Sequence, residues 1–378
     1  MARIKLITLP IREKVEIQLQ NQDTTLIEEE RIVPLKKGIN DIDFAWQNTS
    51  IRAETIIFRV LEENSDLKTN VLSVSYPPNE SALTWQVSSN RNASARVKIT
   101  YAINHLDKKY HYLALANHDE TKLDLTQFIQ VINSSGEEYQ KALINTGIKK
   151  KPLLDLRLNE SQEFSNHKFT SIPIVKNYSV NAATWGYRSR ANDKLNVYMH
   201  YLINNDEQHQ LGQYPLSKGK VRLYQKDKNG TKVFLGEDWA SYTSQDEQAK
   251  LYIGDARDVV VKRIIESNKR QRINGNLYDQ DVVIKYEIEN FKDHPIELIV
   301  EESLPYLRNE VIHSRRHDIN NQNIAWQLGK QTTFNNKPIK KLTNSQLIAY
   351  KVLLPARHKD GQLIKLNKQL NINFKNEW

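Results

Sequence analysis

Three histidines and three acidic residues lie in one short stretch of the chain: His105, His111, His118, Asp119, Glu120 and Asp124. Imidazole and carboxylate groups are the side chains that bind zinc, and carboxylates also bind calcium, so this stretch comes nearest to a metal cluster. A strand that contained His111 and His118 would place them on opposite faces, because their separation is odd. The sequence therefore favours separate roles for these residues, and we expect no metal and no cofactor.

A basic stretch at residues 313–318, HSRRHD, offers a second kind of chemistry. The guanidinium groups of Arg315 and Arg316 match phosphate or sulfate geometry, so the pair could clamp such an anion. The same residues could instead form a solvated turn before a strand at residues 324–328, and the sequence favours this interpretation over an anion site. The two arginines remain candidate ligand contacts.

Four aromatic residues could form a stacking platform for a sugar or a protein partner: Trp185, Tyr187, Trp239 and Tyr242. Tryptophan and tyrosine also fill the cores of β-sandwiches, and the sequence favours that interpretation. Adjacent acids occur at residues 137–138 and 301–302, but adjacent side chains diverge on a strand, unlike the facing carboxylates of a glycosidase. No nucleophile elbow, zinc-protease motif or phosphate-binding loop is present, so no catalytic residue is predicted.

The commonest hydrophobic period is two, which is typical of strands with one buried face. Segments with this pattern include residues 15–20, 95–103, 221–227 and 282–290. Turn residues that accept positive φ separate them, and Asn229-Gly230 between two alternating runs predicts a β-hairpin. Short helical patterns occur only around residues 137–144 and 244–250, so helix is a minor component.

These elements predict an all-β protein of two or more antiparallel β-sandwich modules. A length of 378 residues suits several modules. The polar stretches near residues 159–168 and 269–280 suggest an N-terminal sandwich at 1–165, a hairpin-rich region at 166–275 and a C-terminal sandwich at 276–378.

The net charge is +9, from 54 basic and 45 acidic residues, and the basic residues are spread along the chain. Nucleic-acid binding is therefore not favoured, because a specific binder would concentrate its charge. There is no cysteine, which excludes disulfides and a cysteine nucleophile. The chain contains neither a signal-peptide pattern nor an apolar run long enough for a membrane helix.

Three segments carry a resemblance to a known family: residues 216–224 (LSKGKVRLY), 234–237 (FLGE) and 254–259 (GDARDV). Their order and spacing resemble the family called domain of unknown function 4139, which is related to the C-terminal domain of mucoidy inhibitor A proteins. Similar strands occur upstream, at residues 9–12, 38–49 and 123–139. Ser217 replaces the family's usual hairpin proline, and Asp107-Lys108 stands where a Gly-Trp pair is common.

The chain resembles the compact members of that family, which lack the long coiled coil. This resemblance implies an exported bacterial protein that acts in the periplasm, at the cell surface or outside the cell. It supplies no catalytic residues. The sequence thus favours a non-enzymatic interaction or assembly protein that binds a protein partner or itself through strand edges. A carbohydrate-binding or carbohydrate-active β-sandwich is the alternative.

Overall fold

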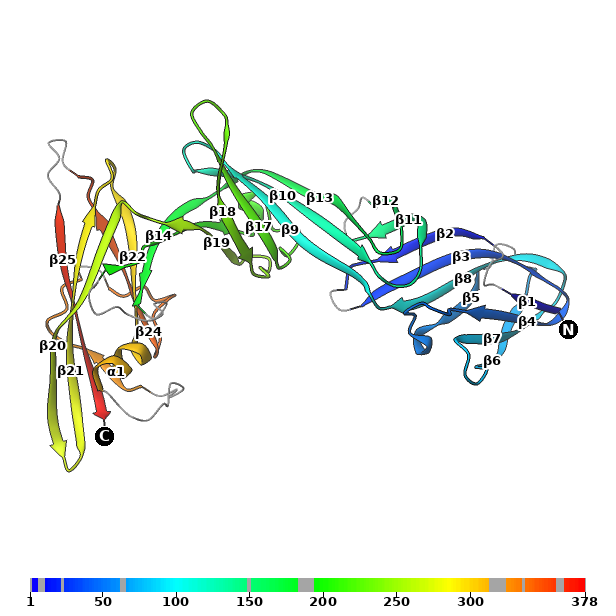
Figure 1. Cartoon of the computed structure of the whole chain (residues 1–378). Coiled ribbons are helices and arrows are strands. Elements are labelled where there is room, and N and C mark those ends of the chain that lie inside the picture. The colour runs from blue at the N-terminus through cyan, green and yellow to red at the C-terminus, as the bar shows by residue number, and fades with distance from the viewer. Residues whose placement is uncertain are drawn as a thin grey trace. The chain divides into compact units, whose positions relative to one another are not determined.

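The computed structural model describes residues 2–5 (backbone only), 11–21, 24–61, 66–147, 151–182, 194–312, 324–334, 337–357 and 364–377. Strands that form five sheets dominate these residues, and the one described α-helix is short. Figure 1 shows the strands running through the whole chain. The predicted all-β class with minor helix is confirmed. None of the described helices has the length and apolar character needed to cross a membrane.

Unit 1, residues 1–111 and 126–168, contains two sheets that enclose one hydrophobic core. The first sheet has the order β1(Ala2–Lys5)-β4(Gly38–Ala45)-β7(Ala82–Ser89)-β6(Thr69–Ser75). The second has the order β12(Leu153–Leu156)-β11(Tyr139–Asn145)-β2(Arg12–Gln18)-β3(Thr25–Leu35)-β8(Ala93–Ile103)-β5(Ile57–Leu61). Trp85 from the first sheet and Ile99 from the second are both buried in this core. Most strand pairs are antiparallel, and β1 with β4 and β2 with β11 are parallel.

Unit 2, residues 112–125 and 169–378, has its own core between two further sheets. One sheet has the order β19(Gln248–Asp255)-β16(Tyr198–Asn204)-β14(Val175–Asn181)-β22(Ile296–Ser303)-β24(Leu347–Leu354). The other has the order β15(Lys194–Leu195)-β20(Val259–Asn274)-β21(Leu277–Asn290)-β25(Lys365–Glu377)-β23(Trp326–Leu328). The helix α1(Leu304–Ile312) follows β22 and buries Leu304, Leu307 and Val311, whose spacing places them on one helical face.

A fifth sheet has the order β13(Glu160–Pro173)-β10(Lys122–Asn133)-β9(Leu106–Ala116)-β17(Gly219–Lys226)-β18(Lys232–Ala240). The division between the units falls inside β9, β10 and β13. The partition expected at residue 275 falls in the two-residue turn of the β20–β21 hairpin, whose strands pair from Val259 to Asn274. These two strands therefore belong to one sheet.

The hairpin expected at Asn229-Gly230 is confirmed as β17 paired with β18. Gly230 has φ 81°, and the Asp227 carboxylate accepts hydrogen bonds from the backbone N–H groups of Asn229 and Thr231 at 2.9 and 2.7 Å. Asp227 and Thr231 also close the turn through their backbones. This geometry is a three-residue loop with glycine in the left-handed position.

Both short helical patterns noted in the sequence are wrong, because residues 139–145 form β11 and residues 248–255 form β19. In β11 the register shifts between Tyr139 and Ala142, and Lys141 adopts φ 49°. This bulge separates two buried residues by three positions instead of two. A bulged strand thereby imitates the spacing of a helix.

Candidate functional site

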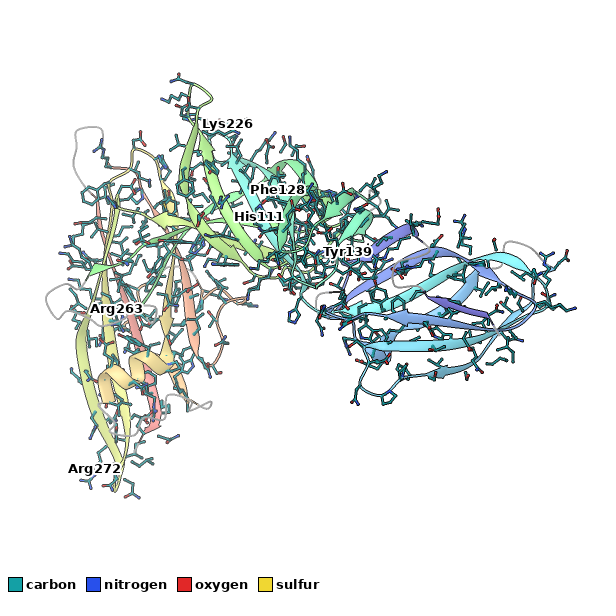
Figure 2. All side chains as sticks on the ribbon, turned by 45° about the vertical axis from the view of Figure 1, so that its right-hand side comes forward. His111, Phe128, Tyr139, Lys226, Arg263 and Arg272 are labelled. Atoms are coloured by element: carbon teal, nitrogen blue, oxygen red, sulfur yellow. The ribbon has the colours of Figure 1, made fainter. Side chains whose placement is uncertain are left out.

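The structure does not bring the three histidines together. His105 has φ 58° between β8 and β9, and His118 follows β9 and accepts a hydrogen bond at its carbonyl from Gln225. The His111 ring stacks on Phe128 with ring centres 5.1 Å apart, and its Nε2 lies 3.1 Å from a Glu163 carboxylate oxygen. Figure 2 labels His111 and Phe128. Within the described part of the chain, no three His, Cys, Asp or Glu residues are placed to bind a metal.

Two of the acids near these histidines, Glu120 and Asp124, have other partners. Both Glu120 oxygens accept from Lys176 Nζ, at 2.8 and 2.7 Å, and the Tyr201 hydroxyl donates to Glu120 at 2.6 Å. Burial raises the pKa of Tyr201, and the hydrogen bond to Glu120 raises it further. Asp124 accepts from the backbone N–H of Ser171 at 2.9 Å. These contacts hold residues 112–125 against the rest of unit 2.

Of the candidate ligand residues, Trp185, Tyr187, Arg315 and Arg316 lie outside the described residues. Trp239 and Tyr242 are described, and the sequence interpretation of them as core residues is wrong: they are 64% and 50% exposed. Trp239 pairs with Lys220 across the β17–β18 hairpin, on the face opposite the buried Val221.

The most buried charges were not expected from the sequence. Arg263 and Glu302 are fully buried, and two parallel hydrogen bonds of 2.8 Å join them. Glu310 binds the remaining side of the guanidinium at 2.9 Å, and the Tyr286 hydroxyl donates to Glu302. Burial disfavours the charged guanidinium, yet the nearby carboxylates keep the pKa of Arg263 well above its usual value.

Unit 1 has a similar network. Glu29 is fully buried and accepts from Arg12 at 2.5 Å and from Arg31 at 2.9 Å. Glu137 accepts from Arg12 and from the hydroxyls of Tyr101 and Tyr139. Each of these groups has a partner inside the protein, so both networks connect separate elements of their unit.

The divergence expected of adjacent acids is seen at Glu301 and Glu302. Glu302 points to Arg263 in the core, whereas Glu301 accepts a hydrogen bond from Asn181 at 3.0 Å. The period of two could have revealed these inward charges. Glu29 and Arg31 lie at every second position of β3 between Ile27 and Val33, so all four side chains point to the same buried face.

The strand β6 is the most unusual surface element of the described structure. It ends its sheet, beyond β7, and all its residues after Thr69 are exposed. Among them Val71, Leu72 and Val74 are 43, 53 and 44% exposed. The segment 69–76, TNVLSVSY, contains no charged residue. Edge strands usually carry charge, proline or a bulge that hinders further pairing. β6 has no charge and no proline, and its register against β7 shifts once, between Val71 and Ser73.

The inner face of β6 extends past the core of unit 1. Val71 lies opposite Val87 and Val74 lies opposite Trp85, and directly paired residues point to the same face of a sheet. Val87 and Trp85 are buried, whereas their β6 partners remain nearly half exposed. The apolar surface that the core presents at this edge is therefore only partly covered.

The other described edge strands differ from β6. Most contain charged residues, as β5 does at Arg59, β12 at Asp155 and β24 at Lys351. On the edge strand β19 the backbone N–H of Tyr252 donates a hydrogen bond to the Asp238 carboxylate at 2.7 Å. This backbone group is therefore already bonded and is not open to another strand. The uncharged edge strand β23 is three residues long. Only β6 therefore offers a long uncharged edge among the described strands.

No protein-family model and no curated protein matches this chain.

Proposed function

We propose that the protein is a non-enzymatic interaction and assembly component, and that β6 is its assembly edge. The observation that carries the proposal is the uncharged, exposed strand with inward-facing valines at the end of a sandwich sheet. Pairing with another strand would satisfy the backbone groups of this edge and cover Val71 and Val74. The occupant that fits best is β6 of a second copy.

Self-pairing suits the composition of β6. In an antiparallel pair related by a two-fold axis, residue i of one copy meets residue j of the other and j meets i, so a charged residue at the axis would meet a like charge. A strand without charged residues has no such repulsion. The interface would thus be the same surface patch on both copies.

The test measures the molar mass of the purified full chain by size-exclusion chromatography with light scattering. We expect a dimer whose population rises with concentration, and we expect Val74→Lys to make the chain monomeric at the same concentration. Val233→Lys is the matched control, because Val233 is 48% exposed on the edge strand β18, which already carries charge. A monomeric wild type, or a dimer that tolerates Val74→Lys, would contradict the proposal.

The resemblance to the domain of unknown function 4139 family supports the setting of this function. We propose that the protein acts in the bacterial cell envelope or outside the cell, as that resemblance implies. Mass spectrometry of the N-terminus of the native protein tests this, because an exported protein would begin at a processed residue. A native chain recovered in the cytosolic fraction would contradict the proposal.

Glycan binding is the second candidate, and the outer face of the β17–β18 hairpin favours it. Trp239 is exposed there, Glu237 binds Arg222 at 3.2 Å, and the rings of Tyr224 and Phe234 meet at 5.4 Å. Exposed aromatic rings can stack on sugars while charged groups bind hydroxyls. A glycan array tests this candidate: retained binding after Trp239→Ala, or no binding by the wild type, would contradict it.

A further inference from the structure

The β20–β21 hairpin extends beyond the core of unit 2. Residues up to Arg263 alternate between buried and partly exposed, but residues 268–274 of β20 are all exposed. The two strands still pair as far as Asn274 and Leu277, and β25 pairs with β21 as far as Tyr278, so the end of the hairpin belongs to the sheet. In Figure 1 the end of this hairpin reaches past α1, and Figure 2 labels Arg272 near its tip.

Three cations lie near the tip of this hairpin: Lys269, Arg270 and Arg272. The segment 269–277, KRQRINGNL, contains no acidic residue. Acids of the neighbouring part of β21 have partners elsewhere, because Asp279 binds Lys375 at 2.6 Å and Asp281 accepts from Asn371 at 2.8 Å. The tip is therefore a cationic end of the hairpin.

Both guanidinium groups are held in place by contacts that leave donors available. The guanidinium carbon of Arg270 lies 3.9 Å from the centre of the Tyr278 ring. Arg272 donates from Nε to the Gly275 carbonyl at 2.8 Å, which leaves its terminal nitrogens at the surface. The pairing places both arginines on one face, opposite Gln280 and Tyr278. Fixed guanidinium groups bind phosphate oxygens at a lower entropic cost than mobile ones.

An apolar residue accompanies these cations. Ile273 is 51% exposed and lies in the register shift between Arg272 and Asn274, directly before the turn. A phosphate group by itself offers no apolar surface for such a side chain. The interface of a phospholipid bilayer takes both groups, because phosphates lie outside the acyl chains.

We propose that the tip of the β20–β21 hairpin binds the surface of an anionic phospholipid membrane. Arg270 and Arg272 contact lipid phosphate oxygens, Lys269 adds electrostatic attraction, and Ile273 enters the boundary between headgroups and acyl chains. The net charge of +9 favours the approach to such a surface. This binding is peripheral and is independent of the β6 edge.

The test is co-sedimentation of the full chain with vesicles of phosphatidylglycerol and phosphatidylcholine, compared with vesicles of phosphatidylcholine alone. We expect binding to the anionic vesicles only, and weaker binding as salt is added. The double variant Arg270→Gln/Arg272→Gln should lower the partition coefficient about 25-fold, since each basic residue near an anionic surface contributes roughly fivefold. Ile273→Ser should lower it several-fold with the charge unchanged.

Lys226→Gln/Lys232→Gln is the matched control, because it removes two charges from the tip of the β17–β18 hairpin. It should keep most of the vesicle binding, and all variants should keep the unfolding midpoint of the wild type. Equal loss in the control would show that net charge alone acts and would overturn the proposal. Binding to a duplex oligonucleotide without binding to anionic vesicles would overturn it as well, in favour of a nucleic-acid partner.

Discussion

Arg263 illustrates how much one side chain contributes to unit 2. It comes from β20 and binds Glu302 on β22 and Glu310 on α1, so it joins both sheets of the sandwich to the helix. Replacing it with methionine would leave Glu302 buried without a counter-charge. We expect Arg263→Met to lower the free energy of unfolding by about 3–5 kcal/mol, measured by urea denaturation.

The matched test replaces both partners. Arg263→Met/Glu302→Leu removes the buried charges together, so it should cost less than Arg263→Met alone. A double variant that is less stable than both single variants would show that the ion pair itself, and not the cost of an unpaired charge, stabilises the sandwich.

His200 makes the stability of unit 2 depend on pH. Burial, followed by the positive charge of Lys250, lowers the pKa of His200 to about 4, while Asp238 acts in the opposite direction. In the unfolded chain the pKa returns to about 6.5. Between pH 4 and pH 6.5 the unfolded state binds more protons at His200 than the folded state does. The free energy of unfolding therefore decreases as the pH is lowered from 6.5 toward 4.

We expect this loss to be about 1–2 kcal/mol, because solvent that reaches the ring reduces the full effect. The measurement is urea denaturation at a series of pH values, with His200→Gln for comparison. In the variant the free energy of unfolding should change less with pH between 4 and 6.5. An unchanged dependence would show that groups other than His200 cause it.

The residue scale also shows what alternation in the sequence can and cannot reveal. Ile17, Val97 and Ile99 follow the period of two and are buried as the pattern predicts. The partner of Glu302 is Arg263 on β20, a strand that does not neighbour β22 in the sequence, and local periodicity does not reveal such a pairing. The residue type of Trp239 suits a core, yet the side chain is exposed because exposure depends on which face of β18 is covered.

At the scale of elements, turns depend on what packs against them. Gly136 has φ 89°, and a Cβ atom there would lie 2.0 Å from the Asn48 carbonyl oxygen. Gly230 has φ 81°, and a Cβ atom there would meet open space. The sequence predicts a turn at both glycines, but only the structure shows that one turn is packed and the other is free.

This difference predicts two sizes of effect. Gly230→Ala should destabilise the chain by about 1–2 kcal/mol, the cost of left-handed backbone at alanine. Gly136→Ala has that cost and a clash with backbone, so we expect a loss of at least about 3 kcal/mol. Thermal and urea denaturation of both variants measure the difference, and equal losses would show that the loop containing Asn48 moves aside easily.

At the scale of the whole molecule, the two units cannot be separated by one cut. Residues 112–125 belong to unit 2 but lie in the sequence between two segments of unit 1. They are tied to unit 2 by the Tyr112 hydroxyl, which donates to the Ser217 carbonyl at 2.7 Å, and by Glu120 bound to Lys176. The sequence partition into successive regions could not anticipate this, because it assumes that each region is continuous.

The interleaved chain predicts how fragments behave. A fragment of residues 1–168 contains all of unit 1 but leaves Tyr112, Leu123 and Leu125, which are buried in the full chain, without their unit 2 neighbours. We expect it to bind a hydrophobic dye more strongly than the full chain does. The fragment 169–378 lacks residues 112–125, so Lys176 and Tyr201 lose Glu120, and its unfolding should be less cooperative. If fragment 169–378 unfolded with the midpoint and slope of the full chain, residues 112–125 would be dispensable for unit 2 and its assigned boundary would be wrong.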